Sequence, residues 1–321
     1  MKSHNRILQF DFVRSICMLY IVGIWHFNNY LNPIYRFSGD LAECLECVTI
    51  SVLATFTFIS GYMLRRYEFS TCGDALTFYK KRLLRIYPLF VLSAISLCLI
   101  RFADFSQVFY GAIGLALFTS DPIKTLWFIS MLIFLYALTP LIRSNRIIRS
   151  KYQVLMSFLL VFFILLMLYI CDIIDVRLLL YAPIYIIGLH IKDLKLSKKE
   201  WLLLIVLAVG AFLLTIYCGA DGLFRMFCSA YLGTIIILAL AFVLPINNLR
   251  KPIGFIAYLS MSMYLFHRQI FGVTLILFGV KNQESAYLPM LLALLALFIS
   301  LCVTYMIQWL YDRIQIRIQN K

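Results

Sequence analysis

Two arginines and two histidines lie inside segments that are otherwise apolar enough to cross a lipid bilayer. Arg14 and His26 lie near opposite ends of segment 12–30, and His267 and Arg268 interrupt a second such segment. An α-helix rises about 1.5 Å per residue, so the twelve steps from Arg14 to His26 span about 18 Å. Ionisable groups are costly in hydrocarbon and usually face a protein interior or a water-filled cavity, where they serve function. We therefore expect the chemistry of this chain at these four residues.

The composition indicates an integral membrane protein. Hydrophobic residues make up 63% of the chain and charged residues 14%, and the mean hydropathy is +0.91, whereas a soluble domain is nearer half apolar. Apolar runs of about 20 residues indicate membrane-spanning helices. The sequence therefore predicts an all-α, polytopic membrane helix bundle that forms a single domain over residues 1–321. About ten transmembrane helices are expected, at residues 12–30, 47–64, 83–102, 126–142, 154–171, 178–191, 201–218, 224–244, 255–278 and 287–311.

The positive charges predict the orientation of these ten spans. With a cytoplasmic amino terminus, 22 of the 29 Lys and Arg residues fall on the cytoplasmic side and 6 on the outer side, with Arg268 inside the membrane. Positive residues gather on the cytoplasmic side of short loops. We therefore expect both termini to be cytoplasmic in a multi-pass protein of the plasma membrane. The net charge of +14 then reflects topology and contact with anionic lipid rather than binding of nucleic acid.

Segment 105–120 is also apolar and is the one region that conflicts with this count. An eleventh span here would invert every later loop and place the basic cluster 143–151 outside. Gly111 and Gly114 weaken a regular helix. We interpret the segment as a re-entrant or interfacial hairpin on the outer side, a backbone form that survives at membrane depth only when protein or a cavity surrounds it.

Four basic residues cluster at the cytoplasmic start of the third predicted span. Arg82 and Arg85 follow Lys80 and Lys81 where the helix is expected to begin. The planar guanidinium fork suits phosphate oxygens, and a helix start adds free backbone N–H groups. A polyanionic cytosolic ligand would find cations here and at Arg14. The alternative, which we favour for the two lysines, is that these residues are ordinary positive-inside anchors on lipid phosphate.

The buried histidines are candidates for proton transfer. An imidazole titrates near neutral pH, so His26 could take a proton from a hydroxyl group; the alternative is a packed histidine that bonds a carbonyl. His267 could bind, orient or relay, and Arg268 could instead pair with an acid on a neighbouring span. His4 and His190 lie near the predicted inner surface and are interpreted as ordinary.

Five stretches, in this order and on ten spans, resemble the acyltransferase-3 family of integral membrane O-acyltransferases. The resemblance covers nearly the whole chain. The stretches are Asp11-Phe12-Val13-Arg14 continuing to Trp25-His26, Phe58-Ile59-Ser60-Gly61-Tyr62-Met63-Leu64, Phe78-Tyr79-Lys80-Lys81-Arg82-Leu83-Leu84-Arg85-Ile86-Tyr87-Pro88, Leu126-Trp127-Phe128-Ile129-Ser130, and Ser260-Met261-Ser262-Met263-Tyr264-Leu265-Phe266-His267.

The resemblance implies transfer of an acyl group, most often acetyl, from cytosolic acyl-coenzyme A to a hydroxyl of an envelope polysaccharide or lipid-linked saccharide outside a bacterial inner membrane. Acyl-coenzyme A would be a co-substrate, with no permanently bound cofactor and no metal. The implied catalytic residues are His26 and His267, and the implied donor-binding residues are Arg14, Arg82 and Arg85. The implied supporting residues are Ser60, Gly61, Trp127, Ser130, Tyr264 and Arg268.

The chain departs from the family in one spacing. Family members typically place ten residues between the first basic residue and the histidine, whereas eleven residues, 15–25, separate Arg14 from His26. On a regular helix the extra residue would turn His26 by about 100°. A π-bulge absorbs one residue and is common at functional sites. The sequence therefore predicts a wide turn between Ser15 and Trp25, plausibly at Gly23, that aims His26 into the bundle.

Two other functional classes remain open. A secondary transporter of an anionic small molecule would also have about ten spans and buried charges, but it would usually show internal repeats, which are not apparent here. A membrane interaction protein would not need arginine and histidine in its core. Cys44 and Cys47 could form a disulfide or half of a metal site, although no second pair accompanies them and an inert role is the better interpretation.

The predicted topology can be tested with a compartment-specific reporter fused after Lys151. We expect activity of a cytoplasmic reporter, because the opposite orientation would place most of the 22 inner basic residues outside. A reporter active only in the extracytoplasmic compartment would overturn the ten-span count and make residues 105–120 a true span.

Overall fold

The computed structural model describes residues 7–26, 39–143, 151–219, 222–277 and 287–319, and the regular secondary structure in these ranges is helical. The described part of each segment predicted to span the membrane falls on a helix, which confirms the all-α prediction. The helices are α1 Leu8–Tyr20, the π-helix η1 Ile21–His26, α3 Asp40–Leu64, α4 Cys72–Leu99, α5 Phe105–Ala112, the 3-10 turn η2 Ala116–Phe118, α6 Trp127–Ile142, α7 Lys151–Ile170, α8 Val176–His190, α9 Lys198–Tyr217, α10 Gly222–Val243, the 3-10 turn η3 Ile246–Leu249, α11 Arg250–Leu277 and α12 Tyr287–Gln319.

Several of these helices have the length and composition of membrane spans. Within the described ranges, six are long and apolar enough to cross a bilayer, and three shorter apolar helices accompany them. In α9 the side chains of Leu203, Val206 and Leu207 are 58%, 67% and 59% exposed. A helix that is apolar on nearly every side and yet exposed to this degree is suited to a lipid environment. The six long helices are Leu8–His26, Asp40–Leu64, Cys72–Leu99, Lys198–Tyr217, Gly222–Val243 and Leu294–Gln315.

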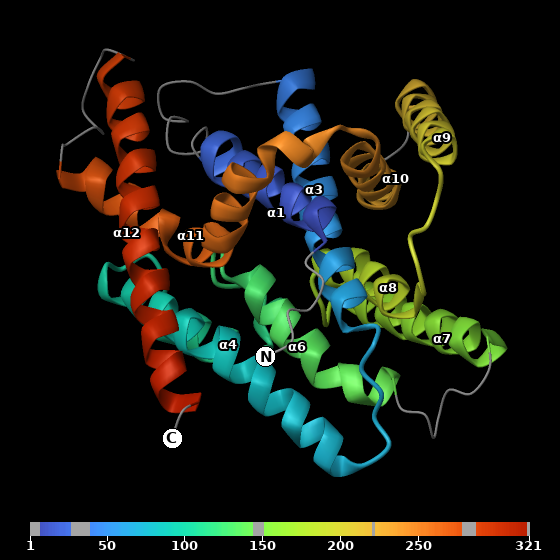
Figure 1. Ribbon diagram of the computed structural model, residues 1–321, viewed down its shortest axis with the longest axis horizontal. Coiled ribbons are helices and arrows are strands. Elements are labelled where there is room, and N and C mark those ends of the chain that lie inside the picture. Colours follow the sequence, from blue (N-terminus) through green and yellow to red (C-terminus); the bar gives the residue numbers. More distant parts are fainter. Residues whose placement is uncertain (1–6, 27–38, 144–150, 220–221, 278–286, 320–321) are drawn as a thin grey trace. The chain divides into compact units, whose positions relative to one another are not determined.

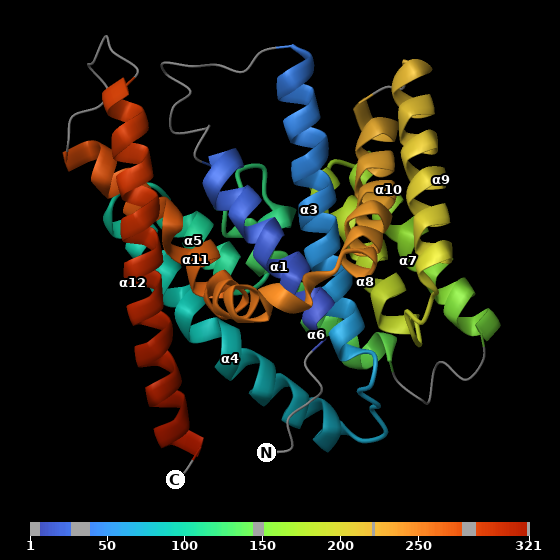
Figure 2. The ribbon, with the colours of Figure 1, turned by 45° about the horizontal axis from the view of Figure 1, so that its top comes forward.

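The chain divides into two compact units, which are described separately. The first unit comprises residues 1–49 and 241–321, and the second comprises residues 50–240. In the first unit, α11 packs against α12 and α1, as Figure 1 shows. In the second unit, α8 packs against α7 and α6, and α6 packs against α4. Helices α9 and α10 of the same unit lie side by side (Figure 2).

Segment 105–120 is not one continuous helix. Helix α5 ends at Ala112, and Gly114 then adopts a positive φ of 84° before the single turn of η2. A side chain at Gly114 would also approach the backbone nitrogen of Phe134 to 3.2 Å. Positive φ is a conformation that glycine adopts without steric cost. The expected break at this glycine is therefore present, and the segment holds an eight-residue helix and a single 3-10 turn, both too short to cross a bilayer.

Two glycines allow the backbones of α3 and α8 to approach closely. A Cβ at Gly61 would lie 2.2 Å from the carbonyl oxygen of Tyr185, and a Cβ at Gly188 would lie 2.4 Å from the carbonyl oxygen of Phe58. Small residues at such crossings allow the close van der Waals packing that holds helices together in membranes, where lipid removes the hydrophobic drive. Gly61, expected from the sequence as a supporting residue of the site, thus has a packing role in the structure.

Replacing Gly61 with alanine should destabilise the protein. The added methyl group would meet backbone atoms that cannot rotate away, and overpacking of this kind costs about 1–3 kcal/mol. Gly210→Ala is the matched control, because nothing lies within 4 Å of the added carbon in the middle of α9. Thermal unfolding in detergent should show a lower midpoint for Gly61→Ala and an unchanged or higher one for Gly210→Ala. Equal midpoints for the two variants would contradict the close crossing.

Candidate functional site

The first helix changes from an α-helix to a wider π-helix within the region where the spacing of Arg14 and His26 predicts a wide turn. Regular α-helix ends at Tyr20, and residues Ile21–His26 form a π-helix that includes Gly23. A π-turn accommodates an extra residue and rotates the side chains that follow. The wide turn predicted between Ser15 and Trp25 is therefore present, and His26 is its last residue.

The π-helix brings His26 into contact with His267, which lies 241 residues later in the chain, on α11. Nδ1 of His26 is 2.7 Å from Nε2 of His267, and the ring centroids are 4.5 Å apart. His267 has no exposed surface, and its Nδ1 lies 2.9 Å from the carbonyl oxygen of Met263. Two imidazoles that share one hydrogen bond, one of them fully enclosed, form an arrangement suited to proton transfer or to orienting one ring by the other.

Two further residues of α11, Tyr264 and Arg268, lie close to His267 in the sequence. The ring of Tyr264 is buried, and its centroid is 6.1 Å from that of His267. Arg268 is half-buried. Both were expected from the sequence as supporting residues, and the structure places them in the same unit as the two histidines.

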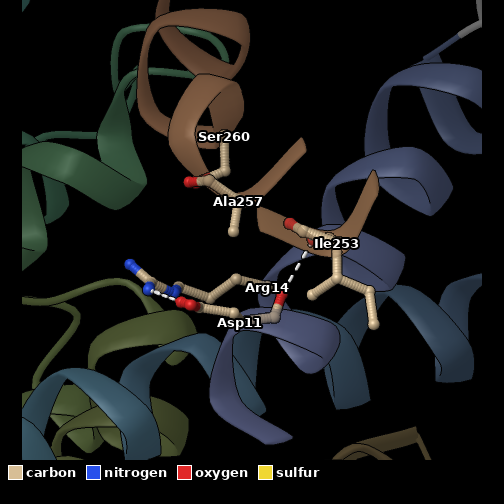
Figure 3. A network of polar contacts seen from close by, with 6 residues as sticks. Asp11, Arg14, Ile253, Ala257 and Ser260 are labelled. Carbon is tan, nitrogen blue, oxygen red and sulfur yellow. Dashed lines mark hydrogen bonds and ion pairs between the residues drawn. The ribbon is translucent and has the colours of Figure 1, made fainter. Parts of the chain in front are cut away.

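Arg14 is held by an acid on its own helix. Its guanidinium pairs with the carboxylate of Asp11, and the two side chains extend together in Figure 3. Asp11 is 2% exposed, whereas the side chain of Arg14 is 31% exposed. The next residue, Ser15, lies 2.7 Å from the carbonyl oxygen of Asp11 and 3.0 Å from that of Ile253, both measured from its Oγ. Asp11 was not predicted as this partner, although the i, i+3 spacing was a signal for it.

Arg82 lies among aromatic rings in the second unit. Its guanidinium carbon is 5.7 Å from the ring centroid of Tyr67, 5.9 Å from that of Phe78 and 6.0 Å from that of Tyr136. These distances are within the range of cation–π attraction. Arg82 is half-buried and Arg85, on the same helix, is exposed.

The helix start predicted at Arg82 is wrong. Helix α4 begins at Cys72, where Thr71 and Asp74 form a reciprocal capping box. Arg82 and Arg85 therefore lie well inside the helix, where backbone N–H groups are already bonded to carbonyls of the preceding turn. The expected contribution of free helix-start N–H groups at these arginines does not exist, and the guanidinium groups alone remain as anion-binding groups.

Two further arginines, which were not predicted from the sequence as site residues, fix the loop that follows α3. Nη2 of Arg143, at the end of α6, donates to the carbonyl oxygens of Arg65 and Tyr67 at 2.7 and 3.3 Å. Nε of Arg65 donates to the carbonyl oxygen of Lys192 at 3.0 Å, and its guanidinium lies 3.7 Å above the ring of Tyr62. These contacts hold Tyr67, and with it one face of the aromatic surroundings of Arg82.

The remaining supporting residues of the second unit have local structural contacts. Oγ of Ser60 donates to the carbonyl oxygen of Phe56 at 2.8 Å. Oγ of Ser130 accepts the backbone N–H of Ala116 at 3.2 Å and so fixes η2. The ring of Trp127 stacks on that of Tyr181 at a centroid distance of 6.1 Å.

An ion pair covers the ring of Trp127. The guanidinium of Arg177 lies 4.5 Å from the ring centroid of Trp127, and its Nε donates to Asp175 at 2.7 Å. Burial opposes ionisation of Asp175, but the hydrogen bonds from Arg177 prevail and hold the pKa of this carboxyl group below its usual value. The acid therefore stays charged near neutral pH and keeps the cation over the indole ring.

The candidate residues thus fall into two groups. Arg14, His26 and His267 belong to the first unit, and Arg82 and Arg85 belong to the second. His190, interpreted as ordinary, bonds the carbonyl oxygen of Ile186 through Nδ1 at 2.9 Å, and His4 lies outside the described residues. Cys44 and Cys47 lie one turn apart near the start of α3. In the described ranges, no three His, Cys, Asp or Glu side chains gather as a metal site would require.

Comparison with known proteins places the chain in a family. A family model for an acyltransferase domain, that of the acyltransferase-3 family, matches residues 7–309. Neither a curated protein nor a solved structure matches the chain. The family match covers nearly the whole chain, including α1 with its π-helix and most of α12. The chain is therefore a member of the acyltransferase-3 family of membrane acyltransferases.

Proposed function

We propose that this protein transfers an acyl group, for which we propose acetyl, from cytosolic acyl-coenzyme A to a hydroxyl of a polysaccharide or glycolipid on the outer side of a bacterial inner membrane. The observation that carries the proposal is the 2.7 Å contact between His26 and His267 in a chain of an acyltransferase family. The proposal includes ten spans with both termini in the cytoplasm, as the distribution of Lys and Arg predicts. Acceptors of this class include lipopolysaccharide and exopolysaccharide.

The donor would bind through its phosphates on the cytoplasmic side. The donor-binding cations that the family resemblance implies are Arg14, Arg82 and Arg85, and an arginine fork can bind phosphate oxygens in bidentate fashion. Asp11 holds the guanidinium of Arg14, so phosphate would share this cation with the carboxylate. The thin pantetheine arm would then extend about 18 Å along the first helix toward His26, a distance set by the helix rise.

The acyl transfer itself needs a general base for the acceptor hydroxyl. His26 removes the hydroxyl proton while the oxygen attacks the thioester carbonyl, so that a C–O bond forms as the C–S bond breaks. The coenzyme A sulfur leaves with the electrons of the C–S bond and takes the proton back from His26. The products are an ester and free coenzyme A, and His26 returns to its neutral form.

A transfer assay with labelled donor tests the proposed function. Purified protein in vesicles would be given acyl-coenzyme A that carries a radiolabel in the acyl group, with an envelope extract as acceptor. Label that moves to the extract, with release of coenzyme A, supports the transferase. Uptake of intact label into the vesicles, without cleavage of the thioester, would favour transport of an anionic small molecule.

Removing the donor-binding cations should weaken donor affinity. Hydrogen bonds to charged groups are worth about 1.5–3 kcal/mol, so Arg82→Ala, Arg14→Ala and Arg85→Ala should each lose about tenfold or more in affinity for acyl-coenzyme A. Arg82→Lys should recover only part of this loss, since lysine lacks the bidentate fork. Lys198→Ala is the control, because this substitution of an exposed residue also removes one cation from the predicted cytoplasmic side. Unchanged calorimetric affinity in all three alanine variants would refute this donor site.

Removing the proposed base should abolish transfer and spare donor binding. His26→Ala should lower the transfer rate by about 10²–10⁴, the usual contribution of general base catalysis. The phosphates bind about 18 Å away, so the affinity for acyl-coenzyme A should not change. His190→Gln is the control, because it alters a half-buried histidine in the other unit. Wild-type transfer by His26→Ala would show that the base lies elsewhere, with His267 the first candidate.

A further inference from the structure

The hydrogen-bond partners of His267 determine which of its nitrogens carries a proton. Nδ1 lies 2.9 Å from the carbonyl oxygen of Met263. A carbonyl oxygen only accepts hydrogen bonds, so this nitrogen must be the donor. Full enclosure of the ring favours its neutral form, since an isolated buried charge is costly. A neutral imidazole with hydrogen on Nδ1 has a lone pair on Nε2, and Nε2 is the atom that faces His26.

The same reasoning then determines the state of His26. Nδ1 of His26 lies 2.7 Å from Nε2 of His267. Since Nε2 of His267 can only accept, Nδ1 of His26 must carry the hydrogen and donate it. A neutral His26 therefore has its own lone pair on Nε2. The chain of donors runs from His26 through His267 to the backbone of α11.

We propose that His267 is a positioning residue that holds His26 in the Nδ1–H tautomer, so that Nε2 of His26 is the atom that takes the proton. This inference rests on the proposed function of His26 as a base. When Nε2 accepts the hydroxyl proton, His26 becomes a cation, and its Nδ1–H···Nε2 bond to His267 becomes a charge-assisted hydrogen bond. The proton taken at Nε2 leaves again from Nε2 to the sulfur, and the proton on Nδ1 does not move.

A neutral histidine in this position replaces the carboxylate that orients the base in hydrolytic triads. There the acid holds the catalytic imidazole in the correct tautomer and stabilises its cationic form. A carboxylate within a membrane span is expensive unless it is paired. An imidazole fixed by a backbone carbonyl supplies the same acceptor without a permanent charge, and α11 provides that carbonyl one turn before His267.

Magnetic resonance of labelled histidine tests this proposal without any substrate. The chain has four histidines, so the ring ¹⁵N and ¹³C signals of the protein in membranes can be assigned with His26→Gln and His267→Gln variants. The chemical shifts distinguish the Nδ1–H tautomer, the Nε2–H tautomer and the cation. We expect the Nδ1–H tautomer for both His26 and His267. Hydrogen on Nε2 of either ring would overturn the proposal, whatever the protein transfers.

Two variants of His267 test the consequence for catalysis. Gln can present an amide oxygen near the position of Nε2, whereas Met fills similar space and offers no comparable acceptor. His267→Gln should keep transfer within about threefold of wild type, and His267→Met should lower the rate about ten- to a hundredfold, the magnitude of a hydrogen bond to a charged group. Affinity for acyl-coenzyme A should be unchanged in both, which shows that they are folded.

The outcomes separate this proposal from the proposed function. Full activity of His267→Met, or an equal loss in both variants, would show that His267 does not act as an acceptor, while transfer by the wild type would still stand. Absence of transfer by the wild type would refute the proposed function, and the resonance measurement would still decide the tautomers. A loss confined to His267→Met, together with Nδ1–H signals from both rings, is the result that supports the proposal.

Discussion

The hydrogen bond between His26 and His267 depends on a widened turn in the first helix, which absorbs one extra residue and ends at His26. A regular helix from Leu8 onward would rotate His26 by about 100° away from the direction that the family spacing gives. The π-helix Ile21–His26 absorbs that residue, and Nδ1 of His26 then lies 2.7 Å from Nε2 of His267. π-helical turns are rare in proteins and occur frequently at functional sites. The candidate catalytic geometry and the local distortion of the backbone are therefore one feature.

Around this pair, several buried polar groups have partners nearby. Asp11 neutralises Arg14 within a single turn of α1, and the backbone of α11 accepts hydrogen bonds from Ser15 and from His267. In the second unit, the carbonyl groups that follow α3 receive the guanidinium of Arg143. Unsatisfied polar groups cost several kcal/mol in hydrocarbon. Such pairing fixes these side chains in place.

Much of this could be read from the sequence, because apolar runs define membrane helices directly. The described part of each predicted span falls largely on a helix, and the break at Gly114 followed from the poor helix propensity of glycine. The start of α4 was missed because hydropathy detects the apolar part of a helix, whereas this helix begins in a polar stretch. The capping box of Thr71 and Asp74 was the available signal.

The candidate site was only partly predictable, for a different physical reason. His26, His267 and Arg14 were named as ionisable residues in apolar segments, and the wide turn followed from one residue too many in a spacing. That the two histidines meet is a tertiary contact across 241 residues, and no local pattern encodes it. The contact of Arg143 is likewise a tertiary one. Its place in the sequence indicated a positive charge near the membrane surface, but it did not indicate which carbonyl oxygens the guanidinium binds.

The central claim is that this chain esterifies an envelope saccharide, and mass spectrometry of envelope glycans from intact cells tests it most directly. Glycans from cells that lack the protein would be compared with those from cells that express the wild type. The account predicts an alkali-labile acyl ester on one glycan of the wild-type cells, absent without the protein and restored when the gene is returned. Glycans with the same acyl esters in both kinds of cell would contradict it.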